Sequence, residues 1–169
     1  MPEQLDRLIS ENVVYLEQIH ELLIETSREW YVEMRPPFAR GSIGKHVRHV
    51  LEFYQLVLNA NAGVVDYDSR ERDERLEQDP ERAASFTTEL KHSIQRRAGS
   101  QDESLVLVYS DGESSQEIGS TFGRELMFLT SHTVHHMAII RMIYELLGGS
   151  VPDSFGVAPS TLRHEKAAG

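Results

Sequence analysis

The chain has 169 residues, with 27 acidic and 17 basic side chains, and its formal charge is −10. A protein of this charge is repelled by nucleic acids and by anionic membranes, so we expect neither as a partner. The sequence contains no cysteine, which excludes disulfides, thiolate ligands and a cysteine nucleophile and leaves histidine and carboxylate as metal-binding groups. The length suits one domain over residues 1–169.

The N-terminal residues, MPEQLDRLISENVV, carry acidic side chains where a secretory signal peptide would be positively charged. The sequence also lacks an apolar run that approaches the roughly 20 residues of a membrane-spanning helix. We therefore expect a cytoplasmic protein.

The first part of the chain predicts two helices. Apolar residues recur at three- and four-residue steps from Gln4 to about Glu29, which is typical of an amphipathic helix. The stretch 35–37 contains two prolines and ends this helix, because proline cannot donate its backbone amide. Ser42 then caps a second predicted helix, which continues to about Asn59.

Residues 61–80 combine turn-forming residues with dense charge and predict a long, solvated connection. Within it, arginine alternates with acidic residues over 70–75, and we interpret this run as solvated surface. A connection of this length suits a crossover between non-adjacent helices of a bundle.

The second part predicts a third helix from about Pro80 to Arg97 and a fourth from Ser120 or Thr121 to Leu147. Between them, residues 104–119 contain two β-prone runs around an Asp-Gly turn, which predicts a small hairpin. The predicted fold is therefore all-α: a four-helix bundle with a long crossover between helices two and three and a small β-hairpin before helix four.

Histidines on two of these helices point to chemistry. His132 lies at the centre of the apolar face of the last helix, and His136 lies about 40° away on the same face. His49 and His46 lie on the second helix, and either residue could reach the last one. Bundles build metal sites from side chains on facing helices, but a buried histidine can also be hydrogen-bonded without an ion. Spacing alone leaves both interpretations open.

Four segments of the sequence carry a family resemblance: SIGKHVRHVLEFY at 42–54, DYDSRERD at 66–73, RELMFLTSHTVHHMAII at 124–140 and FGVAPSTL at 155–162. They resemble the DinB-like (DNA-damage-inducible) family of four-helix bundles, which includes bacillithiol transferases and mycothiol-dependent maleylpyruvate isomerases. The resemblance implies a divalent metal ion, zinc or nickel, held by His49, His132 and His136. In the transferase and isomerase branches it also implies a low-molecular-weight thiol cofactor. His46 and His135 lie within a turn of these ligands, and we assign them to orienting the ligands or transferring protons.

Two functions of different classes follow from this site. The first is a metal-dependent enzyme that transfers a thiol to a small electrophile or hydrolyses a small-molecule substrate, because a bound ion lowers the pKa of a bound thiol or water. The second is a non-catalytic metal-binding or stress-associated interaction protein. We favour the enzyme. We also expect a homodimer, because apolar side chains lie off the predicted core faces at Met127, Met137, Tyr54 and Leu58.

Overall fold

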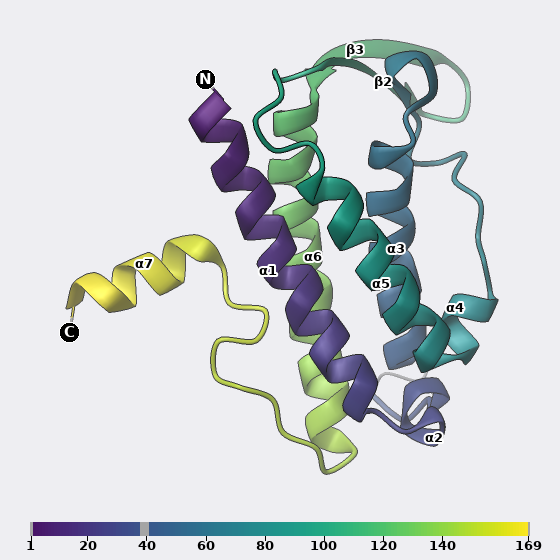
Figure 1. Cartoon of the computed structure of the whole chain (residues 1–169). Coiled ribbons are helices and arrows are strands. Elements are labelled where there is room, and N and C mark those ends of the chain that lie inside the picture. Colours follow the sequence, from purple (N-terminus) through teal and green to yellow (C-terminus); the bar gives the residue numbers. More distant parts are fainter. Residues whose placement is uncertain (1, 38–40, 169) are drawn as a thin grey trace.

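Four long helices form the body of the molecule, with a small sheet across one end (Figure 1). The computed structural model describes residues 2–37 and 41–168. The α-helices of the described chain are α1 (Pro2–Glu25), α2 (Arg28–Val32), α3 (Ile43–Leu58), α4 (Arg75–Gln78), α5 (Pro80–Gln95), α6 (Phe122–Leu146) and α7 (Pro159–Ala168). The strands are β1 (Val64–Val65), β2 (Ser104–Ser110) and β3 (Ser115–Thr121). Helices α1 and α3 each pack against both α5 and α6.

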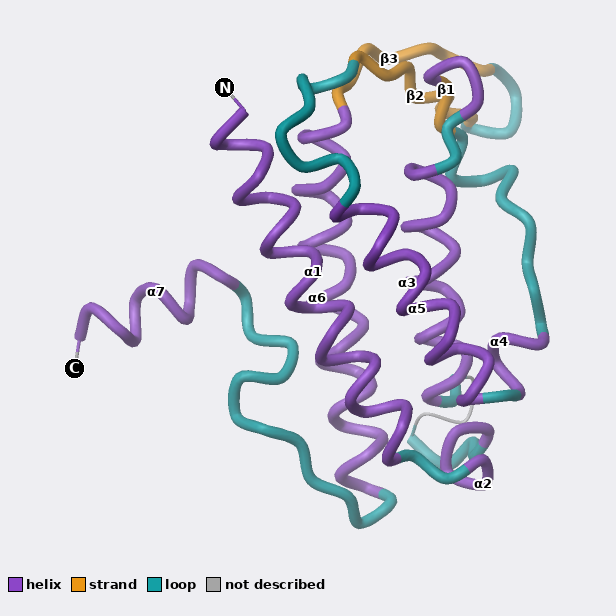
Figure 2. The backbone as a smooth tube through the Cα atoms, in the orientation of Figure 1, coloured by secondary structure: helices purple, strands orange, loops and turns teal. Residues whose placement is uncertain are grey.

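The expected all-α class is wrong, because the structure has a three-stranded mixed sheet and is a mixed α/β fold of high helical content. Strand β2 pairs antiparallel with β3, in the region where the sequence predicts two strands. Strand β1 pairs parallel with β2, with Val64 opposite Val106. Figure 2 shows these strands together at one end of the helices, where α3 ends and α6 begins. A two-residue strand has no measurable periodicity, so the sequence did not indicate β1.

The connection from α3 to α5 is more structured than expected. It contains a 3₁₀ turn (Asn61–Gly63), β1 and α4, and between β1 and α4 it runs along the outside of the helices (Figure 1). The Asp73 backbone N–H donates a hydrogen bond of 2.9 Å to Glu52 Oε1 on α3. The Tyr67 hydroxyl donates one of 2.6 Å to Glu125 Oε2 on α6. These two bonds hold the connection against the helices on which the histidines lie.

Side-chain caps explain where the helices begin. The Ser42 side chain accepts from Lys45 N at the start of α3, and the Thr121 side chain accepts from Arg124 N at the start of α6. The first predicted helix is divided in two, because Ser27 caps the separate helix α2. The four-residue helix α4 and the C-terminal helix α7 were not expected from the sequence.

A chain of buried hydrogen bonds crosses the mainly apolar core between the helices. The Tyr54 hydroxyl donates to Asn12 Oδ1 at 2.7 Å, and Asn12 Nδ2 donates to the Leu126 carbonyl at 3.2 Å. This chain joins α3, α1 and α6. Tyr54 and Met137 are both fully buried, so the expectation that they lie off the core face is wrong.

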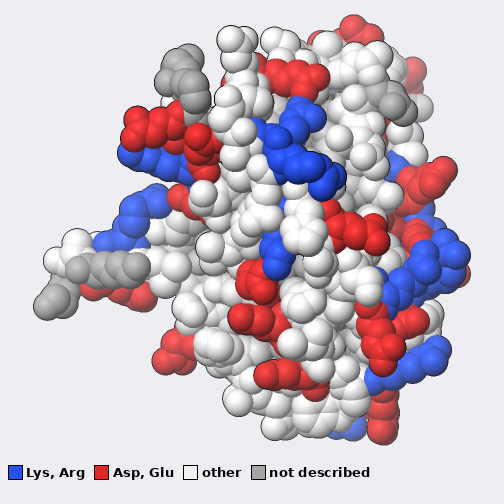
Figure 3. All heavy atoms as spheres, in the orientation of Figure 1, with Lys and Arg blue, Asp and Glu red and all other residues white. Residues whose placement is uncertain are grey.

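Charged side chains of both signs are mixed over the face of the molecule that Figure 3 presents. This face has no broad basic patch among the residues described there. None of the described helices combines the length and the apolarity that a membrane-spanning helix needs.

Candidate functional site

Three histidines face one another where α3 packs against α6. His49 lies on α3, and His132 and His136 lie one turn apart on α6. One ring nitrogen from each residue lies within 4.8 Å of the other two. The ring centroids are separated by 4.9 Å for His49 and His132, 4.7 Å for His49 and His136, and 4.6 Å for His132 and His136. The structure therefore brings together the three residues that the resemblance singled out, and we call them the histidine cluster.

The two further candidates differ in position. His46 Nδ1 lies 2.9 Å from His136 Nδ1, so one of these nitrogens donates a hydrogen bond to the other. His135 is exposed, and its ring lies edge-on to His136 at 5.2 Å. His46 thus extends the cluster, while His135 lies beside it on the solvent side. His20, His92 and His164 are not among its members.

One nitrogen of the cluster lacks a partner. His132 Nε2 is buried and accepts or donates no hydrogen bond among the described residues. A buried polar atom without a partner costs free energy, and native structures contain few of them. A metal ion between the three rings would supply the missing partner, and imidazole nitrogen is a ligand that zinc and nickel accept. The residues present therefore fit a bound ion.

Aromatic rings enclose one side of the cluster. The His132 ring stacks on Phe53 with a centroid distance of 4.3 Å and an interplanar angle of 10°. The ring centroid of Phe128 lies 5.5 Å from that of His132. Tyr67 in turn stacks on Phe53, with a centroid distance of 4.8 Å. These rings shield one side of the imidazoles from water and lower the local dielectric there.

Burial keeps the imidazoles of the cluster neutral. Desolvation is the largest cause that lowers the pKa of His49 to about 4, that of His132 to about 4 and that of His136 to about 3. Neighbouring histidines lower the pKa of each ring further, and Arg70 also lowers the pKa of His49 and His132. Metal ligation requires a neutral imidazole ring, so protonation of the rings does not oppose an ion at neutral pH.

Arg70 is a residue of this site that the sequence reasoning missed. Its side chain is only 12% exposed, and its Nη2 donates to His49 Nδ1 at 3.1 Å. Its Nη1 donates to the Tyr67 carbonyl at 2.8 Å, and its guanidinium lies 4.9 Å above the Phe53 ring. The interpretation of 70–75 as solvated surface is therefore wrong for Arg70. An alternating charge run gives no sign of which arginine turns inward.

A signal for Arg70 was present on α3. Glu52 lies between the buried residues Leu51 and Phe53 and is itself 2% exposed. A carboxylate within an apolar stripe needs a cation nearby. Arg70 Nε lies 3.5 Å from Glu52 Oε2, and Arg48 Nε lies 3.6 Å from Glu52 Oε1. The position of Glu52 thus indicates that a cation lies nearby, without indicating which residue supplies it. Arg48 on the same helix and Arg70 on the connection both do so.

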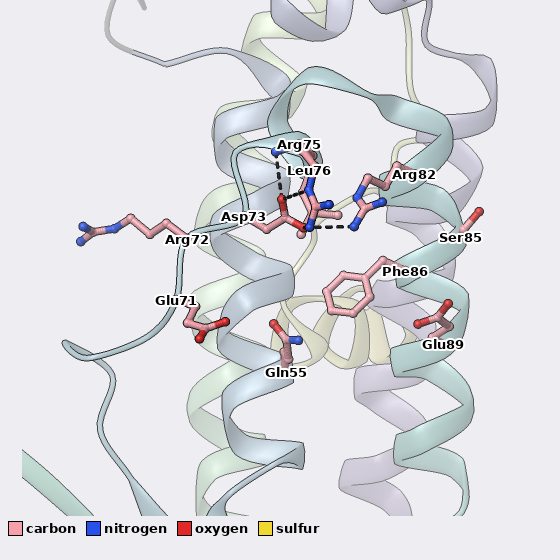
Figure 4. A pocket seen from close by; sticks show the side chains of 10 residues that line it. All are labelled: Gln55, Glu71, Arg72, Asp73, Arg75, Leu76, Arg82, Ser85, Phe86 and Glu89. Atoms are coloured by element: carbon pink, nitrogen blue, oxygen red, sulfur yellow. Dashed lines mark hydrogen bonds and ion pairs between the residues drawn. The ribbon is translucent and has the colours of Figure 1, made fainter.

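A separate cavity of about 600 Å³ lies between α3, α5 and the segment that contains α4. Figure 4 shows Phe86 and Gln55 on its two sides, with Asp73 paired to Arg75 and Arg82 at one end. The described residues that line it include no histidine. The cavity and the histidine cluster are therefore different places on the molecule.

No family model matches the chain, and no solved structure matches it. The chain is similar to a curated protein, FK506-binding protein 5 of the fungus Rhizopus delemar, with 37% identity over 107 residues. The match covers 61% of this chain, and the chain spans only 28% of the length of this relative.

This relative corrects the resemblance to the DinB-like family, because it carries the name of an FK506-binding protein. It also overturns the function that rested on that resemblance: a metal-dependent enzyme of thiol transfer or hydrolysis, with a non-catalytic metal-binding or stress-associated protein as the alternative. Whether the three histidines bind an ion is a separate question, which this comparison does not test. The resemblance rested in part on two histidines four residues apart on a helix, and such a pair also arises in unrelated proteins. In addition, a shared fold does not define a reaction.

Proposed function

We propose that the histidine cluster binds a divalent transition-metal ion, zinc or nickel, with His49, His132 and His136 as its ligands. The observation that carries this proposal is the unpaired, buried Nε2 of His132 beside two other neutral imidazoles. The proposal concerns ion binding, and neither thiol transfer nor hydrolysis is part of it.

The ion would act across the interface between α3 and α6. His49 comes from one helix and the other two ligands from its neighbour, so a shared ion would hold the two helices together. A zinc or nickel ion supplies positive charge and directional bonds to nitrogen. The chain's own part is to keep the imidazoles neutral, which the aromatic enclosure of His132 supports.

Calorimetry on chelator-treated protein tests this proposal. Titration with ZnCl₂ should show one saturable site per chain, and His132→Ala and His136→Ala should each abolish it. The matched controls are His92→Ala, which removes an exposed histidine of α5, and His20→Ala on α1. If the cluster variants and the controls bind zinc with the same stoichiometry and affinity, the histidine cluster is not the site.

The comparison favours a second candidate, the binding of FK506. The name of the relative states this property for a protein of which the chain spans 28%. Calorimetric titration of this chain with FK506 tests the candidate. Saturable binding of one molecule per chain supports it, and the absence of any binding heat that exceeds the dilution control contradicts it.

A further inference from the structure

We infer that Arg70 competes with the metal ion for His49, so that the contact between these two side chains breaks when an ion binds. This inference rests on the proposed function, because it describes how the same site is controlled. Arg70 would then set the affinity of the site without being a ligand.

The hydrogen bond between the two side chains defines the tautomer of His49. Arg70 Nη2 lies 3.1 Å from His49 Nδ1. A guanidinium can only donate hydrogen bonds, so Nδ1 of His49 is the acceptor. A neutral imidazole carries one proton, and with Nδ1 accepting, that proton lies on Nε2.

Neither nitrogen of His49 is then available to an ion. A histidine ligand uses the lone pair of an unprotonated nitrogen of a neutral ring. The lone pair of Nδ1 is occupied by Arg70, and Nε2 is protonated. If the ion takes Nδ1, it displaces Arg70 directly. If it takes Nε2, the proton moves to Nδ1, where it faces an arginine N–H. Both routes require Arg70 to leave His49.

The positive charge of Arg70 also opposes binding of the ion. Arg70 carries a positive charge within hydrogen-bond distance of a proposed ligand, and like charges repel strongly where water is excluded. The Arg70 side chain is 12% exposed, so solvent screens this repulsion only in part.

Arg70 can leave His49 without loss of the fold, because bonds that do not involve Arg70 hold its segment in place. Its Nη1 donates to the Tyr67 carbonyl at 2.8 Å, and its Nε lies 3.5 Å from Glu52 Oε2. Neither contact uses the Nη2 atom that binds His49. The guanidinium is a rigid plane, so a movement that releases His49 also changes these two contacts. The Tyr67 hydroxyl bond to Glu125 and the Asp73 N–H bond to Glu52 do not involve Arg70, and they keep the connecting segment on α6 and α3.

The test compares two charge-removing substitutions in the full chain. Arg70→Met removes the donor and the charge but keeps an unbranched side chain above Phe53. Arg72→Met is the matched control, because Arg72 is exposed on the same segment and its substitution removes the same charge. In ZnCl₂ titrations we expect Arg70→Met to bind about tenfold more tightly than the unaltered chain, and Arg72→Met to stay within about threefold of it.

A second measurement needs no substitution. Nitrogen-15 NMR of ion-free protein with labelled histidine should show His49 protonated on Nε2 and unprotonated on Nδ1. A proton on Nδ1 of His49 would overturn the inference, as would equal zinc affinities of the Arg70→Met and Arg72→Met proteins. If all proteins bind zinc equally, the competition alone is wrong. If none of them binds zinc, the proposed function fails and the competition fails with it.

Discussion

His46 on α3 and His136 on α6 share a hydrogen bond between their Nδ1 atoms, 2.9 Å apart. When the Nδ1 of His136 donates this bond, its Nε2 is unprotonated and is left for the histidine cluster. A hydrogen bond to the far nitrogen of a ligating histidine orients the ring and selects its tautomer. We therefore predict that His46 is a positioning residue of the proposed site.

Removal of His46 should weaken ion binding without removing the site. We expect His46→Ala to lower zinc affinity by about 10- to 100-fold, the usual effect of losing such an orienting partner. His135→Ala is the control, because His135 is exposed, and it should change the affinity less than threefold, roughly the scatter expected for a surface change. Calorimetry measures both, and a larger effect of His135→Ala would contradict the assignment.

Ion binding should stabilise the fold. An ion that binds only the folded chain stabilises it by about 2.7 kcal/mol at a hundredfold excess over its Kd. Adding a chelator to metal-loaded protein should lower the melting temperature. His132→Ala should abolish this difference, whereas His20→Ala should keep it. An unchanged midpoint after chelation, in protein shown beforehand to contain metal, would show that the ion is not tied to the folded core.

The stability of ion-free protein should fall as the pH drops from 7 to 5. Burial lowers the pKa of His49 and His132 to about 4 and of His136 to about 3, against about 6.5 in the unfolded chain. Below pH 6.5 the unfolded chain binds more protons than the folded chain, so the free energy of unfolding decreases. The upper limit is about 1.4 kcal/mol per pH unit for each ring, and solvent screening of these partly exposed rings reduces it.

Urea unfolding at pH 7 and pH 5 measures this effect. His132→Asn, which cannot titrate, should show a shallower decrease than the unaltered chain. His92→Asn is the control on an exposed histidine, and it should leave the decrease in the free energy of unfolding between pH 7 and pH 5 unchanged. Equal slopes for all three proteins would mean that the cluster is not buried as neutral imidazole.

Gly44→Ala should destabilise the protein by about 1–3 kcal/mol, the usual range for overpacking. A Cβ atom at Gly44 would lie 2.3 Å from the Glu77 carbonyl oxygen and 2.9 Å from Tyr31 Cε1. The carbonyl belongs to the backbone of α4, so the clash can be relieved only by moving that helix away from α3. Gly119→Ala is the control, because a Cβ there meets no described atom within 4 Å. Urea denaturation compares the two, and equal stabilities would contradict the close packing of α4 on α3.

We predict a homodimer through the outer face of α6. Met127 is 57% exposed, Met142 45% and Leu146 53%, and the three lie within about 100° of one another on the helical wheel. Exposed apolar groups on one face commonly mark an interface. Light scattering at high protein concentration should give a dimer mass, and Met142→Glu should give a monomer. Ser85→Glu, on the exposed side of α5, should remain dimeric. A monomer mass for the unaltered chain would contradict the prediction.

Local spacing alone determined several features of this protein. Ser42 caps α3 and Thr121 caps α6, because a cap depends on residues only three positions away. His132 and His136 share a face because four residues make about one helical turn. These relationships lie within one helix, so they can be read from the sequence without knowing what packs against that helix.

The tertiary structure decided the relationships between segments. It paired β1 with β2, buried Tyr54 and Met137, joined His46 to His136 and turned Arg70 toward His49. Residues 49 and 70 lie on different segments, and the distance between their side chains depends on the path of the whole connection between them. A charged run in the sequence looks the same whether its arginines face water or a buried carboxylate. Only the packed structure, in which Glu52 on α3 needs a cation, distinguishes Arg70 from its exposed neighbours.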